Sequence, residues 1–134
     1  MIQKYIDAFM AAKPKIEAQL ETAHPENYKD LVTRVIRICS EVKGEHGWAE
    51  APDPQRITVI DHGDYQGTQL YVIGADGYQP SAYWAIFVNY GSCSGCDTFE
   101  AIRNYTDEPP TVEQVKEYWT LMLHMVQNMK NISE

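Results

Sequence analysis

Basic residues are scarce in this chain. Its 134 residues contain 11 Lys and Arg against 19 Asp and Glu, so the formal net charge is −8. A chain so short of positive charge lacks the electrostatic attraction that holds nucleic acid or an anionic membrane surface. We therefore expect no direct binding to either. Two interpretations of the acidity stay open: it keeps a small domain soluble, or it suits a basic groove on a partner protein.

Cysteines and long apolar runs are scarce as well. Three cysteines are few and odd in number, which argues against a disulfide framework and favours a reducing compartment. The longest apolar stretch, Ala82–Val88, has only seven residues, and no apolar run follows a basic start. Neither a membrane span nor a secretory signal is therefore expected. These patterns predict a cytoplasmic protein, folded as a single domain over residues 1–134.

Apolar residues at helical spacing predict helices in the first third of the chain. One stripe runs from Ile2 to Leu20, and Pro14 within it predicts a kink or break. A second stripe covers residues 28–42, and we expect Pro25 to occupy the first turn of that helix.

A long helix is also predicted near the other end of the chain. Its broad apolar face spans residues 112–129, and Thr111 with Gln114 forms a capping-box pattern at its start. Asp97 is expected to cap a short helix over residues 98–104. No strand is expected after that point, so the chain is predicted to stay helical to its end.

Three runs rich in β-branched and aromatic residues predict strands over residues 57–60, 68–73 and 82–90. Glycines and prolines in residues 43–55 predict an irregular loop before the first strand. The short connections between the strands favour an antiparallel arrangement. The predicted fold is α+β, with a three-stranded antiparallel β-meander packed against N-terminal helices and a long C-terminal helix.

Strand alternation predicts two different faces on this sheet. Along the third strand, Tyr83, Ala85, Phe87 and Asn89 point one way, whereas Trp84, Ile86, Val88 and Tyr90 point the other way. If the helices cover only one face, an aromatic surface is left for a partner or a homodimer; alternatively, the first helix covers it. The candidate partner-contact residues are Tyr71, Tyr83, Trp84 and Tyr90.

The pair Cys93-x-x-Cys96 follows the third strand and precedes the predicted short helix. Thiolates near a helix N-terminus gain reactivity and metal affinity. One interpretation is a Zn²⁺ site completed by His62 with Asp61 or Asp64, since two such thiolates form half of a tetrahedral site. Asp61, His62 and Asp64 could also act as a general-base set, but acidic residues around glycine are what ordinary turns contain, and we favour the turn.

Two other interpretations of the cysteine pair stay open. Residues 83–102 resemble the strand, cysteine pair and helix of thioredoxin-like proteins, which implies Cys93 as the attacking thiol and Cys96 as the resolving one. Alternatively, the small residues around both cysteines simply permit a tight turn from strand to helix.

Residues 61–102 also resemble a pattern found in small uncharacterised proteins of bacteriophages. The motifs are Asp64-Tyr65-Gln66-Gly67, Leu70-Tyr71-Val72 and Tyr90-Gly91-Ser92-Cys93-Ser94-Gly95-Cys96-Asp97. The resemblance implies an accessory phage or prophage protein in a bacterial cytoplasm, and it lends no catalytic residues.

The function that these patterns favour is binding to a host protein, as an inhibitor of a nucleic-acid-processing defence system of the anti-CRISPR kind. Acidity suits competition for a basic groove, and an aromatic sheet face supplies contact area. The alternative is a zinc or thiol-redox protein centred on Cys93 and Cys96.

Overall fold

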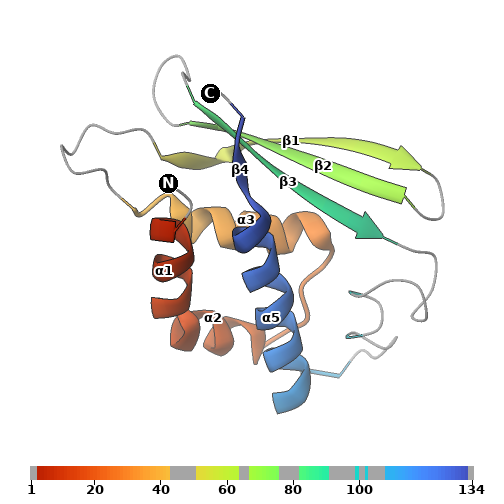
Figure 1. The fold of residues 1–134 in the computed structure, drawn as a ribbon. Helices are drawn as coiled ribbons and strands as arrows, with labels where there is room; N and C mark the ends of the chain where they lie inside the picture. The colour runs from red at the N-terminus through yellow and green to blue at the C-terminus, as the bar shows by residue number, and fades with distance from the viewer. Residues whose placement is uncertain are drawn as a thin grey trace.

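The chain folds into a layer of helices beneath an antiparallel sheet, as the computed structural model in Figure 1 shows. The structure describes residues 3–42, 51–63, 67–75, 82–90, 99, 102 and 108–132. Within these ranges, only the main chain is described at residues 61–63, 67, 89, 90 and 131. The predicted α+β class and the antiparallel pairing of the three predicted strands are confirmed.

The first stripe forms two helices, α1 (Gln3–Ala11) and α2 (Lys13–Leu20). The predicted break is confirmed, and it falls at Ala12, so that Pro14 lies in the first turn of α2. Proline is tolerated there because the amide that it lacks has no partner within the helix. The side chains of Tyr5 and Phe9 on α1 are buried in the core.

The second stripe forms α3 (Tyr28–Cys39), and its predicted apolar face is buried. The helix begins three residues later than expected, so the placement of Pro25 in its first turn was wrong. Asn27 is the N-cap, and its side-chain oxygen accepts a 2.8 Å hydrogen bond from the amide of Asp30. An asparagine cap satisfies a first-turn amide, which fixes the start of the helix.

The sheet consists of β1 (Pro52–Gly63), β2 (Gly67–Ala75), β3 (Tyr83–Tyr90) and β4 (Lys130–Asn131), in the order β1-β2-β3-β4. The first strand begins at Pro52, so the prediction of irregular structure up to residue 55 was wrong for residues 52–55. Its pairing with β2 is irregular between Pro52 and Ile57. Because β1 is an edge strand, Pro52 and Pro54 interrupt no inner ladder.

The long helix α5 (Val112–Asn128) has the predicted capping box. The Thr111 hydroxyl accepts from the amide of Gln114 at 3.2 Å, and the Gln114 carbonyl oxygen accepts from the amide of Thr111 at 2.8 Å. Of the predicted short helix over residues 98–104, Phe99 and Ile102 are described, and both are helical and buried.

The chain does not stay helical to its end, which corrects that expectation, because it turns back into the sheet after α5. Met129 ends the helix in an extended conformation, and β4 then pairs antiparallel with Trp84 and Ala85 of β3. The sheet therefore has a short fourth strand that the sequence pattern did not predict.

The core lies between the sheet and the helices. The ring of Tyr5 meets that of Trp84 edge-on at 6.2 Å between centroids, which joins α1 to β3. Phe9 stacks on Trp119 of α5 at 5.6 Å. Helices α1, α3 and α5 all lie on the same side of the sheet in Figure 1. No helix within the described ranges is long and apolar enough to cross a membrane.

Candidate protein-interaction surface

One face of the sheet carries none of the described helices, and we call it the outer face (Figure 1). The register aligns Phe87 with Leu70 and Leu70 with Ile60, so these three side chains form one row across three strands. The neighbouring row is Ala85, Val72 and Thr58. Tyr83 and Gly74 are paired in the next row, and Ile132 follows β4 beside them, with its amide 2.9 Å from the carbonyl oxygen of Tyr83.

The outer face carries most of the large hydrophobic side chains that the described ranges expose. Phe87 is 61% exposed, Ile60 and Ile132 are 50% exposed, and Tyr83 is 39% exposed. Met10 and Val112, which lie on helices, complete this exposed set. Scattered exposed hydrophobics need no explanation, but several gathered on one uncovered face mark an interaction site.

Arg56 and Tyr83 flank Gly74 at one end of the outer face. A Cβ atom built on Gly74 would lie 3.5 Å from the Cβ of Arg56 and 3.6 Å from the Cε1 of Tyr83. The Arg56 guanidinium turns to the strand ends, where Nη1 donates to the carbonyl of Ala75 at 2.9 Å and Nε lies 3.3 Å from a carboxylate oxygen of Asp53. The aliphatic part of Arg56 therefore extends the apolar row.

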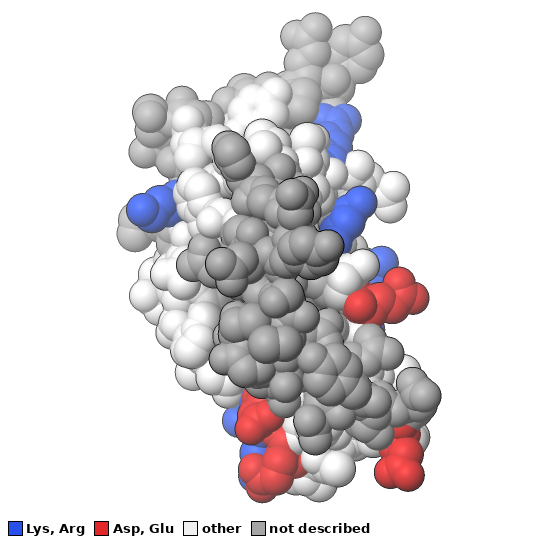
Figure 2. Space-filling view, turned by 90° about the vertical axis from the view of Figure 1, so that its right-hand side faces the viewer, with Lys and Arg blue, Asp and Glu red and all other residues white. Residues whose placement is uncertain are grey.

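The described rows of the outer face contain two charged side chains, Arg56 and Lys130. The charge of Arg56 is paired with Asp53 at the strand ends, whereas Lys130 is exposed and lies opposite Ala85. On the side of the molecule that Figure 2 shows, most of the described carboxylates lie toward the lower end. The described rows of the outer face contain no carboxylate, so the negative charge of the chain is not concentrated there.

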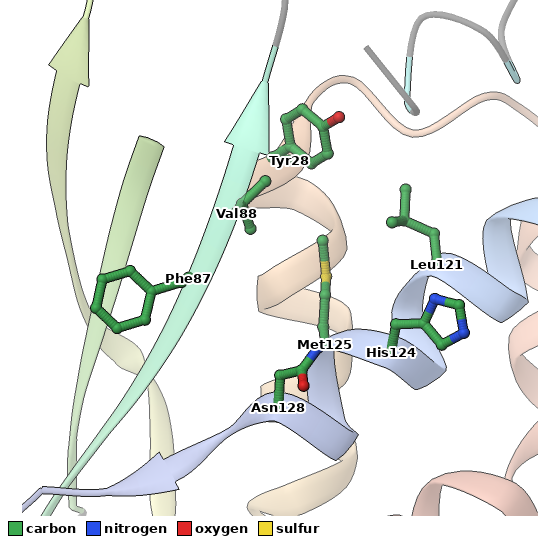
Figure 3. A pocket seen from close by; sticks show the side chains of 7 residues that line it. All are labelled: Tyr28, Phe87, Val88, Leu121, His124, Met125 and Asn128. Carbon is green, nitrogen blue, oxygen red and sulfur yellow. The ribbon is translucent and has the colours of Figure 1, made fainter. Parts of the chain in front are cut away.

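A pocket of about 200 Å³ lies on the opposite side of β3, between that strand and α5 (Figure 3). Tyr28, Val88 and Met125 surround the same space, whereas the ring of Phe87 lies on the other side of the strand. Phe87 therefore lines the pocket with its main chain. Three residues of α5 complete the lining: Leu121, His124 and Asn128.

The predicted partner-contact residues are divided between the two faces. Tyr83 lies exposed on the outer face. Tyr71 and Trp84 are buried against the helices, so they are not available for contact with a partner, and this part of the prediction is corrected. The reason is alternation: Tyr71 pairs with Ile86, and both belong to the face that the helices cover. The side chain of Tyr90 lies outside the described residues.

The predicted metal or thiol site lies largely outside the described ranges. Cys93, Cys96 and Asp64 are not among the described residues. The main chain places Asp61 opposite Gln69 and His62 opposite Thr68, near the end of β1. Within the described ranges, no group of three or more His, Cys, Asp or Glu side chains is arranged to hold a metal ion. Zinc binding and thiol redox chemistry at Cys93 and Cys96 therefore stay predictions.

The described cysteine, Cys39, has no chemical role in this surface. It is a free, fully buried thiol on the inward face of α3. Desolvation by burial raises its pKa to about 12, against a smaller lowering by a backbone hydrogen bond. A thiol with so high a pKa stays protonated and is a poor nucleophile.

Comparison with family models, with curated proteins and with solved structures found no match for this chain.

Sequence reasoning passed over three of the most exposed residues of the outer face: Ile60, Phe87 and Ile132. The alternation along β3 did place Phe87 on the same side as Tyr83, so a signal for it was present. Ile132 had no such signal, because its position depends on β4.

Proposed function

We propose that this chain is a binding protein that docks on another protein through its outer face. The observation that carries the proposal is the row formed by Ile60, Leu70 and Phe87, whose ends are half or more exposed and over which no described element lies. Large apolar side chains on a rigid sheet lose little conformational freedom when they are covered, which makes them effective contact residues.

The partner surface that suits this face is apolar at its centre, with carboxylates at its edge. Apolar contact would bury Phe87 and Ile60, and the edge would meet Lys130. The net charge of −8 still favours long-range approach to a basic partner, as expected from the sequence. The basic groove of that partner would then face other parts of this chain rather than the described outer face.

The finer part of the proposal is supported by the resemblance of residues 61–102 to small bacteriophage proteins. By that resemblance, the partner is a protein of the bacterial host. The role is inhibition of a nucleic-acid-processing defence system, in which occupation of a protein surface blocks the access of nucleic acid.

The experiment compares two pairs of substitutions. The outer-face variant carries Ile60→Ser and Phe87→Ser, and the control carries Met10→Ser and Val112→Ser, which remove similarly exposed hydrophobics from helices. Each tagged protein is used to capture partners from a bacterial lysate, and affinity for the captured protein is then measured. We expect the outer-face variant to bind at least about tenfold more weakly and the control to bind normally.

Two outcomes would contradict the proposal. In one, the control loses the partner and the outer-face variant retains it. In the other, sedimentation shows a homodimer that the outer-face substitutions dissociate, which would make a second copy of this chain the occupant of the face.

A further inference from the structure

Beyond Ala85, the edge of β3 that faces away from β2 is open as far as the described residues show. It pairs with β2 along its whole length, from Tyr83 to Tyr90. On its other side, β4 pairs only with Trp84 and Ala85, and the amide of Ile132 adds a bond to Tyr83. No described residue pairs with residues 86–90 on that side.

The hydrogen-bonding direction of each β3 residue follows from two observed bonds. The carbonyl of Ala82 accepts from the amide of Ala75 at 3.0 Å, so the main-chain amide and carbonyl of Ala82 point toward β2. The carbonyl of Tyr83 accepts from the amide of Ile132 at 2.9 Å, so the main-chain amide and carbonyl of Tyr83 point toward β4. Because these directions alternate along an antiparallel strand, the amide and carbonyl groups of Phe87 and Asn89 face the open edge.

The pocket between β3 and α5 adjoins this edge on the inner face of the sheet. Its floor is apolar, with Val88, Leu121 and Met125, and its polar atoms come from Tyr28, His124 and Asn128. At about 200 Å³ it is below the usual range for a whole small-molecule ligand, and it suits one large side chain.

We propose that the open edge of β3 binds an extended segment of the partner protein, which pairs antiparallel with Phe87 and Asn89 and places one large apolar side chain in the pocket. In such pairing, residues opposite Phe87 and Asn89 exchange hydrogen bonds with them. The partner residue between these two lies opposite Val88, and its side chain points to the same face as Val88, where the pocket lies.

The site favours an extended partner segment over a second copy of this chain. The edge already accepts an antiparallel strand, β4, and the new segment would continue the same ladder. If two copies paired through β3, the described side chains nearest to the pocket would be Ile86 and Val88 of the second copy. Both are buried beneath their own helices, so they could not enter it.

This inference rests on the proposed function because the occupant is a protein segment, but it uses a different surface. The probe is a set of fluorescent peptides of alternating Thr and Lys, with a single central residue that is Leu, Phe, Met or Ser. Binding to the full chain is measured by anisotropy. We expect the peptides with a central Leu, Phe or Met to bind at least about tenfold more tightly than the peptide with a central Ser.

N-methylation of the peptide tests the strand pairing without changing the protein. The amides on either side of the central residue would bond to Phe87 and Asn89, and N-methylation of either should abolish binding. The amide of the central residue faces away from β3, and its N-methylation should be tolerated. Equal loss at all three positions, or no loss at any, would overturn the proposal.

Two tryptophan variants test the pocket. Leu121 and Leu123 are both partly buried on α5, but only Leu121 lines the pocket. Leu121→Trp should fill the pocket and weaken binding of the Leu peptide at least tenfold, about 1.4 kcal/mol, whereas Leu123→Trp should not. The Ile60→Ser protein, in which β3 is unchanged, should still bind the peptide, so loss of binding at the outer face can be told apart from loss of binding at the β3 edge. A dimer that forms through β3 would overturn the proposal.

Discussion

The imidazole Nδ1 of His24 lies 2.6 Å from the hydroxyl oxygen of Tyr118, 94 positions later in the chain. The other ring nitrogen, Nε2, lies 2.8 Å from the carbonyl oxygen of Glu108. A carbonyl oxygen only accepts, so Nε2 carries a proton and donates, and in the neutral ring Nδ1 accepts from Tyr118. His24 therefore holds together the segment after α2, the residues before α5 and the middle of α5.

We expect His24→Ala to lower the free energy of unfolding by about 1–3 kcal/mol, because it removes the partly buried hydrogen bond to Tyr118 and the exposed one to Glu108. Urea denaturation of His24→Ala, Tyr118→Phe and the double variant gives the coupling between the two residues. A coupling of about 0.5–3 kcal/mol is expected for a direct contact. Strictly additive effects would show that the 2.6 Å contact contributes nothing to stability.

The side chain of Gln114 makes two different hydrogen bonds, so even a conservative substitution is expected to lower the stability of the protein. Its carbonyl oxygen completes the capping box with Thr111, while its Nε2 donates to the carbonyl of Ile102 at 2.9 Å. Glu serves equally well in a capping box, but Gln114→Glu would place a carboxylate against a carbonyl oxygen. We expect a loss of about 1–3 kcal/mol by urea denaturation at pH 7.

Acidification provides the control for that substitution. Protonation of the new carboxyl group restores a donor toward the carbonyl of Ile102, so the deficit of Gln114→Glu relative to wild type should shrink as the pH falls through about 4. A deficit that is constant with pH would contradict this account.

Gly74 is expected to tolerate a side chain. The atoms nearest to a Cβ placed at this position lie at 3.5 to 3.7 Å, which is ordinary van der Waals contact, and the residue lies in the extended strand β2. Gly74→Ala should raise the free energy of unfolding by about 0.4–1 kcal/mol, chiefly because the unfolded chain loses conformational freedom. The midpoint of urea denaturation measures this, and a lower midpoint would mean that Arg56 or Tyr83 cannot accommodate the methyl group.

Burial of Cys39 predicts a loss of stability at alkaline pH. Its pKa is about 12 in the folded protein against 9.0 for an unperturbed thiol. Between these two pH values the unfolded chain releases the thiol proton and the folded chain keeps it. The contribution of Cys39 to the free energy of unfolding is therefore complete below pH 9 and falls as the pH rises toward 12. The slope is about 1.4 kcal/mol per pH unit.

The measurement for Cys39 is the difference in unfolding free energy between wild type and Cys39→Ala at several pH values. Tyrosines and lysines titrate in both proteins, so their effects largely cancel. At neutral pH the variant should be less stable, because a buried sulfur is lost. That difference should narrow as the pH rises above about 9, and a difference that does not change with pH would contradict the prediction.

Local patterns predicted the helices well, because each contains its own signal. The apolar stripe of α3 and the capping box of α5 are properties of residues close together in the sequence. The strand β4 has no such signal: Lys130 and Asn131 are polar, and they become a strand only because the edge of β3 lies beside them. Propensity also failed at Pro52 and Pro54, which an edge strand accommodates.

The sequence predicted part of the candidate surface. Alternation along the third strand separated Tyr83 from Trp84, and an uncovered face was one of the two arrangements that the sequence left open. Contact residues were nevertheless chosen for their aromatic character from both faces, and the structure buries Tyr71 and Trp84 while it exposes Phe87. Which face the helices would cover depends on how α1, α3 and α5 pack together, and no local pattern determines that.

The join between α5 and β4 limits how this fold can vary in length. One residue, the buried Met129, separates the last helical residue from the first strand residue. An insertion or deletion of one residue within α5 would turn everything after it by about 100° about the helix axis. Lys130 would then miss its place beside Ala85. We therefore expect substitutions within α5 to be tolerated more readily than the insertion or deletion of a single residue, because β4 follows the helix so closely.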